Sequence, residues 1–270
     1  MTIDEKFLKS TLSLIDEVAD FILKEAASFD LGKVEYKDRN DLVSYVDRNS
    51  EAQLRKGLMN LLPGSGFIGE EGEDENVDAE WRWIVDPLDG TTNFIHGIPA
   101  YCISVALQRN EVTLLGIIQD VPKGEVFHAI KGKGAWLDGR PIQVKQHEKL
   151  DFALIGTGFP RDSGALQHDY LAALGALLDC SHGLRRIGAA ALDLAYVACG
   201  RLDGFFEMGL KPWDVAAGAL LVEEAGGKVS DIQNGSQFLF GKQIVASNTF
   251  LQPSLLHILD QHLGRWAART

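Results

Sequence analysis

Cysteine is scarce in this sequence of 270 residues. Its three cysteines, Cys102, Cys180 and Cys199, lie far apart and form no Cys-x-x-Cys pair. Disulfide frameworks and the common zinc sites need paired or clustered cysteines, so we expect neither. We predict three reduced thiols, which is the usual state of cysteine in the cytoplasm.

Long apolar runs are also lacking. A membrane-spanning helix needs about 20 consecutive, mostly apolar residues, and the sequence contains no such run. A secretory signal has an uninterrupted apolar stretch after a basic start, whereas residues 1–28 carry charges among their apolar positions. We therefore expect a soluble, cytoplasmic protein with no membrane partner.

Basic side chains are outnumbered by acidic ones. The sequence has 26 Lys and Arg against 38 Asp and Glu, for a net charge of −12 at pH 7. General nucleic-acid binding needs a basic face, so we do not expect it. A small phosphorylated substrate is not excluded, because exposed charges are screened beyond about 8 Å at physiological salt. Divalent cations bound beside such a substrate would outweigh the distant negative surface.

The composition is otherwise that of a folded protein, with 46% hydrophobic and 24% charged residues. Apolar residues recur at helical spacing over residues 3–28, where Thr2 and Glu5 have the pattern of a capping box. A second helix is predicted over residues 47–62 because Pro63-Gly64 follows it.

Residues 81–149 have the pattern of an antiparallel sheet. An apolar strand begins at Trp81, and turn residues then recur at roughly 8–12-residue intervals. These turns predict strands at 102–108, 112–120 and 125–130.

Strands and helices alternate after residue 150. The predicted strands are 153–157, 203–207, 228–231 and 243–247, and the predicted helices are 164–178, 189–199, 214–225 and 253–263. No linker rich in Pro, Gly or Ser separates the two regions. We therefore predict two closely packed parts: residues 1–149, with N-terminal helices and an antiparallel sheet, and residues 150–270, of α/β type.

Two aspartates stand at the end of an apolar strand in the segment Trp83-Ile-Val-Asp-Pro-Leu-Asp-Gly-Thr-Thr-Asn-Phe94. Asp86 and Asp89 are three positions apart, and the proline between them disfavours helical geometry at the residue before it. Asp89 and the glycine after it predict a turn. Thr91 then begins a predicted helix, and the free N–H groups of a helix start bind phosphate.

Carboxylates beside a phosphate repel it unless cations lie between them. Mg²⁺ binds one or two carboxylates together with phosphate oxygens, so the pair predicts a magnesium and phosphate site. An Asx turn followed by a helix cap explains Asp86 or Asp89 alone equally well. It does not explain both aspartates followed by Gly-Thr-Thr.

Three more acidic residues stand at the starts of loops or helices. Glu70 follows an apolar strand, but it opens an acidic run that is more typical of a solvated loop. Asp47 begins a predicted helix, where an ordinary N-cap is slightly favoured. Asp214 also begins a helix, and its position suits a cap and a metal ligand equally.

Together these segments resemble the inositol monophosphatase family. The resemblance covers almost the whole chain and rests on Gly69-Glu-Glu71, Asp86–Phe94, Pro212–Gly218 and Glu224–Gly227, in the order and spacing of the family. Two further segments, Thr157–Pro160 and Arg185–Tyr196, are similar to its bacterial SuhB-like branch. The resemblance implies a layered αβαβα sandwich, of mixed α+β or α/β class, which is usually a homodimer with its site between the two halves.

The resemblance also implies the metal ligands. Glu70, Asp86 and the carbonyl of Leu88 would hold one Mg²⁺, and Asp86, Asp89 and Asp214 a second. A weaker third ion near Glu70 is common in the family.

Substrate contacts are implied in the same way. The amides of Gly90 and Thr91 would bind the phosphate, while the Ala190 amide, Glu207 and Asp89 would contact the polyol hydroxyls. Thr91 and Glu70 would activate the attacking water, so the implied catalytic set is Glu70, Thr91 and Asp86. Lys37 and Asp47 would contact the metal-binding residues without binding the metal themselves.

The implied reaction is the Mg²⁺-dependent, lithium-sensitive hydrolysis of myo-inositol 1-phosphate to inositol and phosphate. Fructose 1,6-bisphosphate, histidinol phosphate, 3′-phosphonucleotides and other small polyol phosphates are alternative substrates. Ala189 stands where relatives often have Thr or Ser, a departure that bears on substrate preference. Some bacterial relatives associate with the transcription machinery, so a regulatory protein with residual phosphatase activity is a second alternative. Arg185-Arg186 would serve such a contact, although a pair of arginines more often forms internal or dimer ion pairs.

Haloacid dehalogenase phosphatases are a chemical rival, because they too place an Asp before Asp-Gly-Thr at a strand end. Their aspartates are two positions apart, and the first is a nucleophile. Here the pair is three apart, a proline follows Asp86, and an antiparallel sheet follows the motif. We therefore expect direct attack of water on phosphorus, with no phosphoenzyme.

Overall fold

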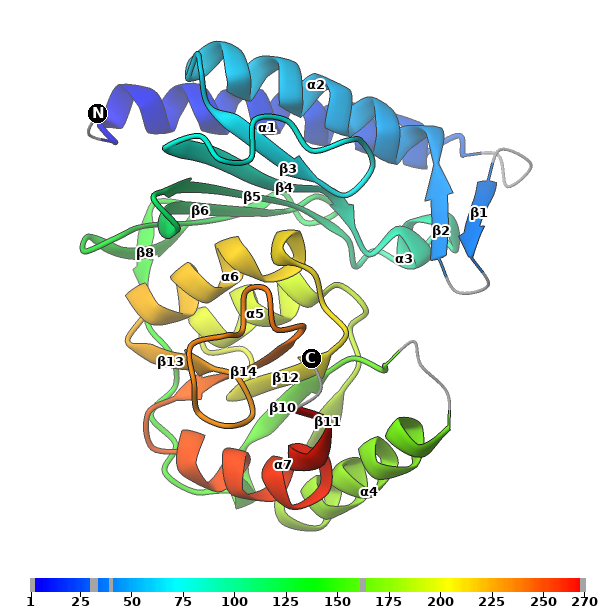
Figure 1. Cartoon of the computed structure of the whole chain (residues 1–270), viewed down its shortest axis with the longest axis vertical. Helices are drawn as coiled ribbons and strands as arrows, with labels where there is room; N and C mark the ends of the chain where they lie inside the picture. The colour runs from blue at the N-terminus through cyan, green and yellow to red at the C-terminus, as the bar shows by residue number, and fades with distance from the viewer. Residues whose placement is uncertain (1–2, 30–33, 39–40, 161–163, 268–270) are drawn as a thin grey trace.

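Helices and sheets alternate in layers through the molecule (Figure 1). This computed structural model describes residues 3–29, 34–38, 41–160 and 164–267. The two larger sheets are separated by one pair of helices and covered on their outer faces by two other pairs. From the N-terminal side, the pairs are α1 (Glu5–Ala26) with α2 (Tyr45–Leu61), α5 (Ala190–Ala198) with α6 (Pro212–Glu224), and α4 (Ala165–Cys180) with α7 (Gln252–Ala267). The αβαβα sandwich is confirmed.

The N-cap of the first helix lies two residues after its predicted position. Asp4 is the N-cap of α1, and its carboxylate accepts a hydrogen bond of 2.8 Å from the backbone N–H of Phe7. The prediction of a capping box at Thr2 and Glu5 is therefore wrong for Glu5, which is the first residue of the helix and not the third; Thr2 lies outside the described residues.

The first sheet contains seven strands in sequence order. Only its first pair is parallel; the others form the predicted antiparallel series. The strands are β3 (Gly66–Gly69), β4 (Trp81–Asp89), β5 (Cys102–Arg109), β6 (Val112–Asp120), β7 (Glu125–Ile130), β8 (Gly134–Leu137) and β9 (Arg140–Ile142).

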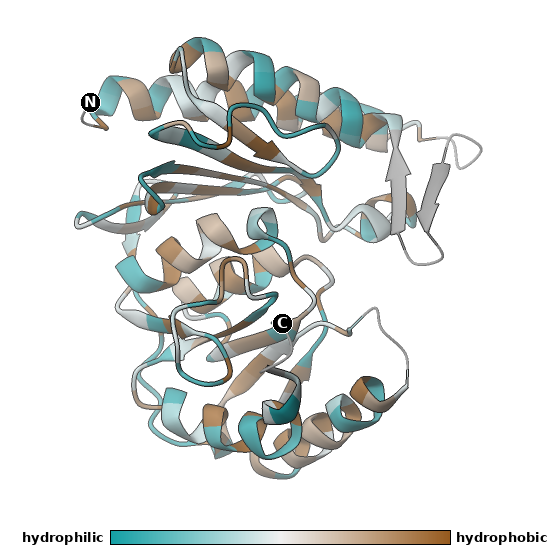
Figure 2. Ribbon diagram, viewed as in Figure 1, coloured by the Kyte–Doolittle hydropathy of each residue, from teal (hydrophilic) through white to brown (hydrophobic). Residues whose placement is uncertain are grey.

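This sheet is buried on both faces. Val85 of β4 packs in the core beneath α1 and α2, whereas its neighbour Ile84 packs in the core formed with α5 and α6. The central strands are therefore almost continuously hydrophobic, while α1 and α2 alternate between hydrophobic and hydrophilic residues (Figure 2). Each fully buried aliphatic side chain contributes about 1.5–3 kcal/mol to the stability of this arrangement.

Helix α6 lies directly on the first sheet. A Cβ added to Gly116 of β6 would stand 2.7 Å from the carbonyl oxygen of Ala217 in α6. At the next residue of α6, a Cβ on Gly218 would stand 2.5 Å from the Leu194 side chain of α5. Glycine at both positions thus lets the middle layer pack closely against the sheet and within itself.

The second sheet has five strands in the order β11-β10-β12-β14-β13. β10 pairs in parallel with β11 and β12, and β14 pairs antiparallel with β12 and β13. The strands are β10 (Leu154–Thr157), β11 (Gly183–Arg185), β12 (Gly204–Met208), β13 (Gly227–Ser230) and β14 (Gln243–Asn248).

Several short elements were not predicted. They are the hairpin of β1 (Val34–Asp38) and β2 (Asp41–Ser44), the strand β11, the pair β8–β9 and the 3₁₀ turn η2 (Leu150–Phe152). The predicted helix at Thr91 is the single short helix α3 (Thr91–Ile95). None of the three cysteines is bridged, and no helix of the described residues is both long and apolar enough to cross a membrane.

Candidate active site

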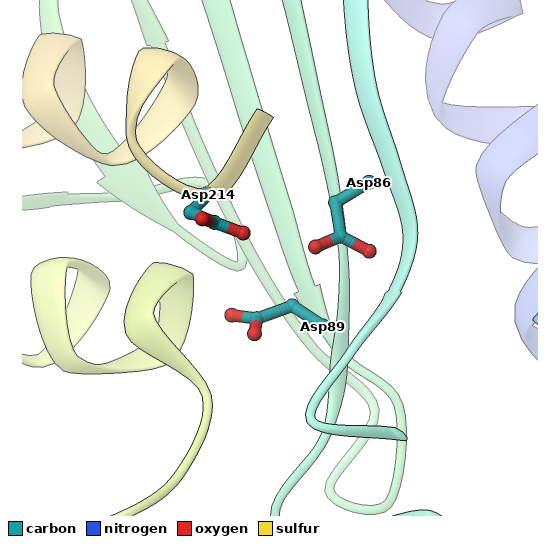
Figure 3. Close-up of side chains that lie close together, drawn as sticks. All are labelled: Asp86, Asp89 and Asp214. Atoms are coloured by element: carbon teal, nitrogen blue, oxygen red, sulfur yellow. The ribbon is translucent and has the colours of Figure 1, made fainter. Parts of the chain in front are cut away.

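Three carboxylates meet between the first sheet and the middle layer of helices (Figure 3). Asp86 and Asp89 come from the end of β4, and Asp214 from the start of α6. One oxygen of each lies within 4.8 Å of the others. Asp86 and Asp89 are buried, and Asp214 is half-buried.

A β-bulge places the two aspartates of β4 on the same face of the sheet. Asp86 pairs with Ser104 and Asp89 with Cys102, so three residue steps on β4 face two on β5. In a regular strand, residues three apart point to opposite faces. Because of the bulge, Val85 and Leu88 both pack under α1 and α2 while both aspartates face α6. Asp86 also accepts a hydrogen bond of 2.9 Å from the Leu88 N–H within the bulge.

Asp89 lies at the N-terminal end of α5. Its Oδ2 accepts a hydrogen bond of 2.7 Å from the backbone N–H of Ala191, and the thiol of Cys102 is 3.8 Å from the same oxygen. The partial positive charge of a helix start stabilises a carboxylate there. The sequence did not single out the Ala191 amide.

Asp214 is the third residue of α6, and its side chain both closes the start of this helix and belongs to the cluster. Its Oδ2 accepts a hydrogen bond of 2.6 Å from the Lys211 N–H. The residue before it is anchored to the first sheet, because the Ser104 hydroxyl donates to the Trp213 carbonyl at 3.0 Å. The two interpretations of Asp214 are therefore compatible, since one oxygen can close the helix start while the carboxylate still faces Asp86 and Asp89.

The electrostatics of the cluster favour a positive ion. Burial, followed by the charges of Glu70, Asp89 and Asp214, raises the pKa of Asp86 well above its usual range. Burial and then Asp214 raise the pKa of Asp89 to about 7, against the lowering effect of the Ala191 and Ala190 amides. Close, buried carboxylates repel one another, so they are all ionised only when a cation lies among them. Without a cation, at least one of them holds a proton. A set of hard carboxylate oxygens suits Mg²⁺.

Glu70 lies beside this cluster but outside its closest group. β3 pairs in parallel with β4, with Gly69 opposite Val85, so the residue after β3 comes next to Asp86. The charge of Glu70 accordingly raises the pKa of Asp86. Its carboxylate is not among the three whose oxygens lie within 4.8 Å of one another.

The turn after β4 joins Thr91 to Asp47. Gly90 has φ +95°, and a Cβ there would stand 2.8 Å from the Ala100 carbonyl, so only glycine fits. The Thr91 hydroxyl is 2.9 Å from Oδ1 of Asp47 and 3.1 Å from the carbonyl oxygen of Leu88. The helix α2 begins at Tyr45, so Asp47 is its third residue and buried, and the interpretation of Asp47 as an ordinary N-cap is wrong.

The predicted polyol contacts lie on the other side of the cluster. Ala190 begins α5, and Glu207 lies on β12 against Gly158, where a Cβ would be 2.0 Å from the Glu207 carboxyl carbon. The sequence missed the buried Asp193 of α5. Burial, then the charges of Glu207 and Asp89, raise the pKa of Asp193 well above its usual range. An acidic residue within the apolar stretch of α5 was the available signal.

The side chain of Lys37 lies outside the described residues, although its backbone belongs to β1. Its predicted support of the site therefore stays a prediction.

The sequence is similar to known proteins over almost its whole length. The model of the inositol monophosphatase family matches residues 4–263. The chain is 40% identical to the Nus factor SuhB of Pseudomonas aeruginosa over 96% of this chain and 97% of that protein. It is 43% identical to an inositol-1-monophosphatase of Mesorhizobium japonicum over 86% of this chain and 88% of that one.

A solved structure shares the fold over nearly the same length. The extragenic suppressor protein suhB of Bartonella henselae superposes with a TM-score of 0.89 and is 37% identical, covering 93% of this chain and 97% of its own. The match of the family model over the chain and the similarity of these relatives agree with the layered fold and the carboxylate cluster. The chain belongs to the inositol monophosphatase family.

Proposed function

We propose that this protein is a magnesium-dependent phosphatase that hydrolyses the monoester of a small polyol, with myo-inositol 1-phosphate as the leading substrate. The observation that carries the proposal is the group of Asp86, Asp89 and Asp214, whose oxygens lie within 4.8 Å of one another beside two helix starts. Carboxylates supply the cation ligands, and backbone amides supply the phosphate and hydroxyl donors.

In this proposal Glu70, Asp86 and the Leu88 carbonyl hold one Mg²⁺, and Asp86, Asp89 and Asp214 hold a second. Bound cations of this kind neutralise the phosphoryl oxygens and lower the pKa of a water. The buried carboxylates fit that role because burial and mutual repulsion already favour a positive partner for Asp86 and Asp89.

Thr91 orients the attacking water. Its hydroxyl has one proton, and the nearby Asp47 oxygen at 2.9 Å is an acceptor for it. The lone pairs of the Thr91 oxygen then remain to accept a hydrogen bond from the water and orient it, and the carboxylate of Glu70 is the group proposed to take the proton that the water loses. The amides of Gly90 and Thr91 bind the phosphate, while Asp89, the Ala190 amide and Glu207 contact the hydroxyls of the polyol.

A panel of kcat/KM values with Mg²⁺ tests this function. The panel contains myo-inositol 1-phosphate, fructose 1,6-bisphosphate, histidinol phosphate and a 3′-phosphonucleotide. We expect the highest value for the inositol ester and loss of activity in EDTA. Full activity in EDTA would refute the metal mechanism, whereas a higher value for another ester would change the substrate and keep the reaction.

A second function is favoured by the names of relatives. The similar proteins of P. aeruginosa and Escherichia coli are named Nus factor SuhB, so we propose that this cytoplasmic chain, as a homodimer, also binds a component of the transcription machinery. Arg185-Arg186, at the end of β11, is the basic pair that we assign to this contact. Capture of RNA polymerase from lysate by an inactive Asp86→Asn variant would support a role separate from catalysis. Capture that Arg185→Ala and Arg186→Ala leave unchanged would exclude the assigned pair.

A further inference from the structure

Helix α2 carries a second buried carboxylate one turn after Asp47. Glu51 is only 3% exposed, although it is a charged residue in a helix that covers the sheet. Its Oε2 accepts a hydrogen bond of 2.8 Å from the backbone N–H of Glu71. Its Oε1 accepts one of 3.1 Å from Arg55. A buried charge is costly unless it is paired and hydrogen-bonded, and here each oxygen of Glu51 has a charged or N–H partner.

The loop after β3 is built around this carboxylate. A Cβ on Gly69 would stand 2.5 Å from Oε2 of Glu51, and a Cβ on Gly72 would stand 2.7 Å from Oε1. Neither glycine has a positive φ, so their backbone conformation does not require glycine. Close approach to Glu51 is what both positions have in common.

The same loop is closed at its base. Phe67 and Glu75 exchange two backbone hydrogen bonds, of 2.8 and 2.9 Å. Arg55 reaches across this base, with Nη1 3.7 Å from the Glu75 carboxylate and its guanidinium 4.2 Å from the centre of the Phe67 ring. The loop is thus held at its base by backbone pairing and at its turn by Glu51, and Glu70 lies between these two anchors.

Asp47 and Glu51 are one helical turn apart, so they point from the same face of α2. Asp47 is within hydrogen-bond distance of Thr91, and Glu51 holds the amide next to Glu70. One rigid helix therefore contacts both loops that carry the catalytic set on this side of the cluster.

We propose that Glu51 is a positioning residue, which fixes the Glu70–Glu71 turn so that Glu70 and Asp86 can bind the same cation. The first half of this statement concerns the fold of the loop alone, and the second half rests on the proposed function. Partners of metal ligands typically contribute about 10–100-fold in metal affinity, so a loose turn weakens Mg²⁺ binding even though every ligand is present.

The test uses two variants and a control on the same helix. Glu51→Gln keeps a neutral acceptor of the same length, Glu51→Ala removes the acceptor, and Gln53→Ala changes an exposed residue of α2. Hydrogen exchange of residues 67–75 is measured in metal-free protein, and the Kd for Mg²⁺ is measured by calorimetry. Circular dichroism establishes that each variant is folded.

For Glu51→Ala we expect exchange of the Glu71 amide to accelerate on the order of tenfold or more, and the Kd for Mg²⁺ to rise about tenfold or more. Glu51→Gln should restore most of the slow exchange of the Glu71 amide and most of the Mg²⁺ affinity. In both variants, kcat at saturating Mg²⁺ should change less than the Kd for Mg²⁺. A merely structural role would lower stability without changing the Kd of the folded protein.

Wild-type exchange and Kd in folded Glu51→Ala would overturn the inference, as would fast exchange combined with an unchanged Kd. The two proposals fail separately. Wild-type protein that does not bind Mg²⁺ refutes the metal site and the second half of the inference, while the exchange measurement still decides whether Glu51 holds the turn.

Discussion

Individual residues of the cluster stabilise the local backbone by a hydrogen bond and also carry a charge. A substitution can remove the charge and keep the hydrogen bond. Asp86 is the clearest case, because its Oδ1 accepts the Leu88 N–H in the bulge while its charge is surrounded by those of Glu70, Asp89 and Asp214. An asparagine keeps an oxygen for the hydrogen bond but has no charge for a cation.

We therefore expect Asp86→Asn to fold normally and to lose about a hundredfold or more of kcat. Because the substitution removes a buried repulsive charge, the free energy of unfolding of the metal-free protein should be equal to or above that of wild type at pH 8. Steady-state kinetics and denaturant unfolding measure these two effects. Asp78→Asn, at an exposed position, is the control and should change neither. Near wild-type kcat at saturating Mg²⁺ would contradict the proposed sharing of Asp86 between two cations.

Asp89 gives the site a dependence on pH. Its pKa of about 7 in the metal-free protein means that it is half protonated near neutrality, and a cation must displace that proton. Mg²⁺ should therefore bind more tightly as pH rises from 6 to 8, with release of protons on binding. Calorimetry in two buffers of different ionisation enthalpy measures the number released. Equal affinity at pH 6 and pH 8, without proton release, would argue that Asp89 does not bind the cation.

The buried Asp193 makes the stability of the protein depend on pH, because its pKa is also raised. Its folded-state pKa lies above the unfolded value, so the folded protein holds this proton more tightly. Its stabilising effect is complete below about pH 4, the usual pKa of a carboxyl group, and is lost as pH rises through the raised pKa. Asp193→Asn should therefore lose less stability than wild type between pH 5 and pH 8. Urea unfolding at both values measures the difference, and parallel pH profiles would contradict the assignment.

At the scale of elements, the position of α6 decides where Asp214 lies. The helix touches β6 at Gly116, where an added Cβ would meet the Ala217 carbonyl at 2.7 Å. Backbone cannot move aside as a side-chain end can, so Gly116→Ala must push α6 away from the sheet.

We expect Gly116→Ala to destabilise the protein by about 1–3 kcal/mol and to weaken Mg²⁺ binding through displacement of Asp214. Gly175→Ala in α4 is the matched control, because a Cβ there meets nothing within 4 Å. Since alanine favours a helix over glycine by about 1 kcal/mol, the control should be as stable as wild type or more so. Unfolding in urea and Mg²⁺ calorimetry measure both effects, and a Gly116→Ala variant as stable as Gly175→Ala would contradict the close packing.

The elements also show what the sequence allowed us to predict. The strands β5, β6 and β7 each end at turn residues that are visible in the sequence, and the structure confirms these strands within one residue. The meeting of Asp86 with Asp89 was predicted, but the bulge that causes it depends on pairing with β5, which is not a local property. Asp193 and Glu51 were missed because an acidic residue in a helix normally faces solvent. Their burial depends on β10 and on the loop after β3, which are distant in sequence.

At the scale of the whole molecule, the site combines residues of the first sheet with a residue of a helix that leads into the second sheet. Asp86 and Asp89 belong to the first sheet, whereas α6, which carries Asp214, leads into β13 of the second sheet. The middle layer packs in one continuous core that includes residues of β4, β5 and β6 together with β12 and β14. The two parts therefore share this core, in addition to one core that each part forms from its own residues.

This arrangement predicts that the protein unfolds in one transition and that Mg²⁺ stabilises all of it. A ligand that binds only the folded state adds about 2.7 kcal/mol to its stability at 100 times its Kd, and cations between Asp86 and Asp214 link the sheet to the middle layer. Calorimetric scans should show a single peak that moves to higher temperature with Mg²⁺ in wild type and stays in place in Asp86→Asn. Two peaks, of which Mg²⁺ moves only one, would mean that residues 1–149 and 150–270 unfold separately. The cation would then stabilise one part, without linking the two.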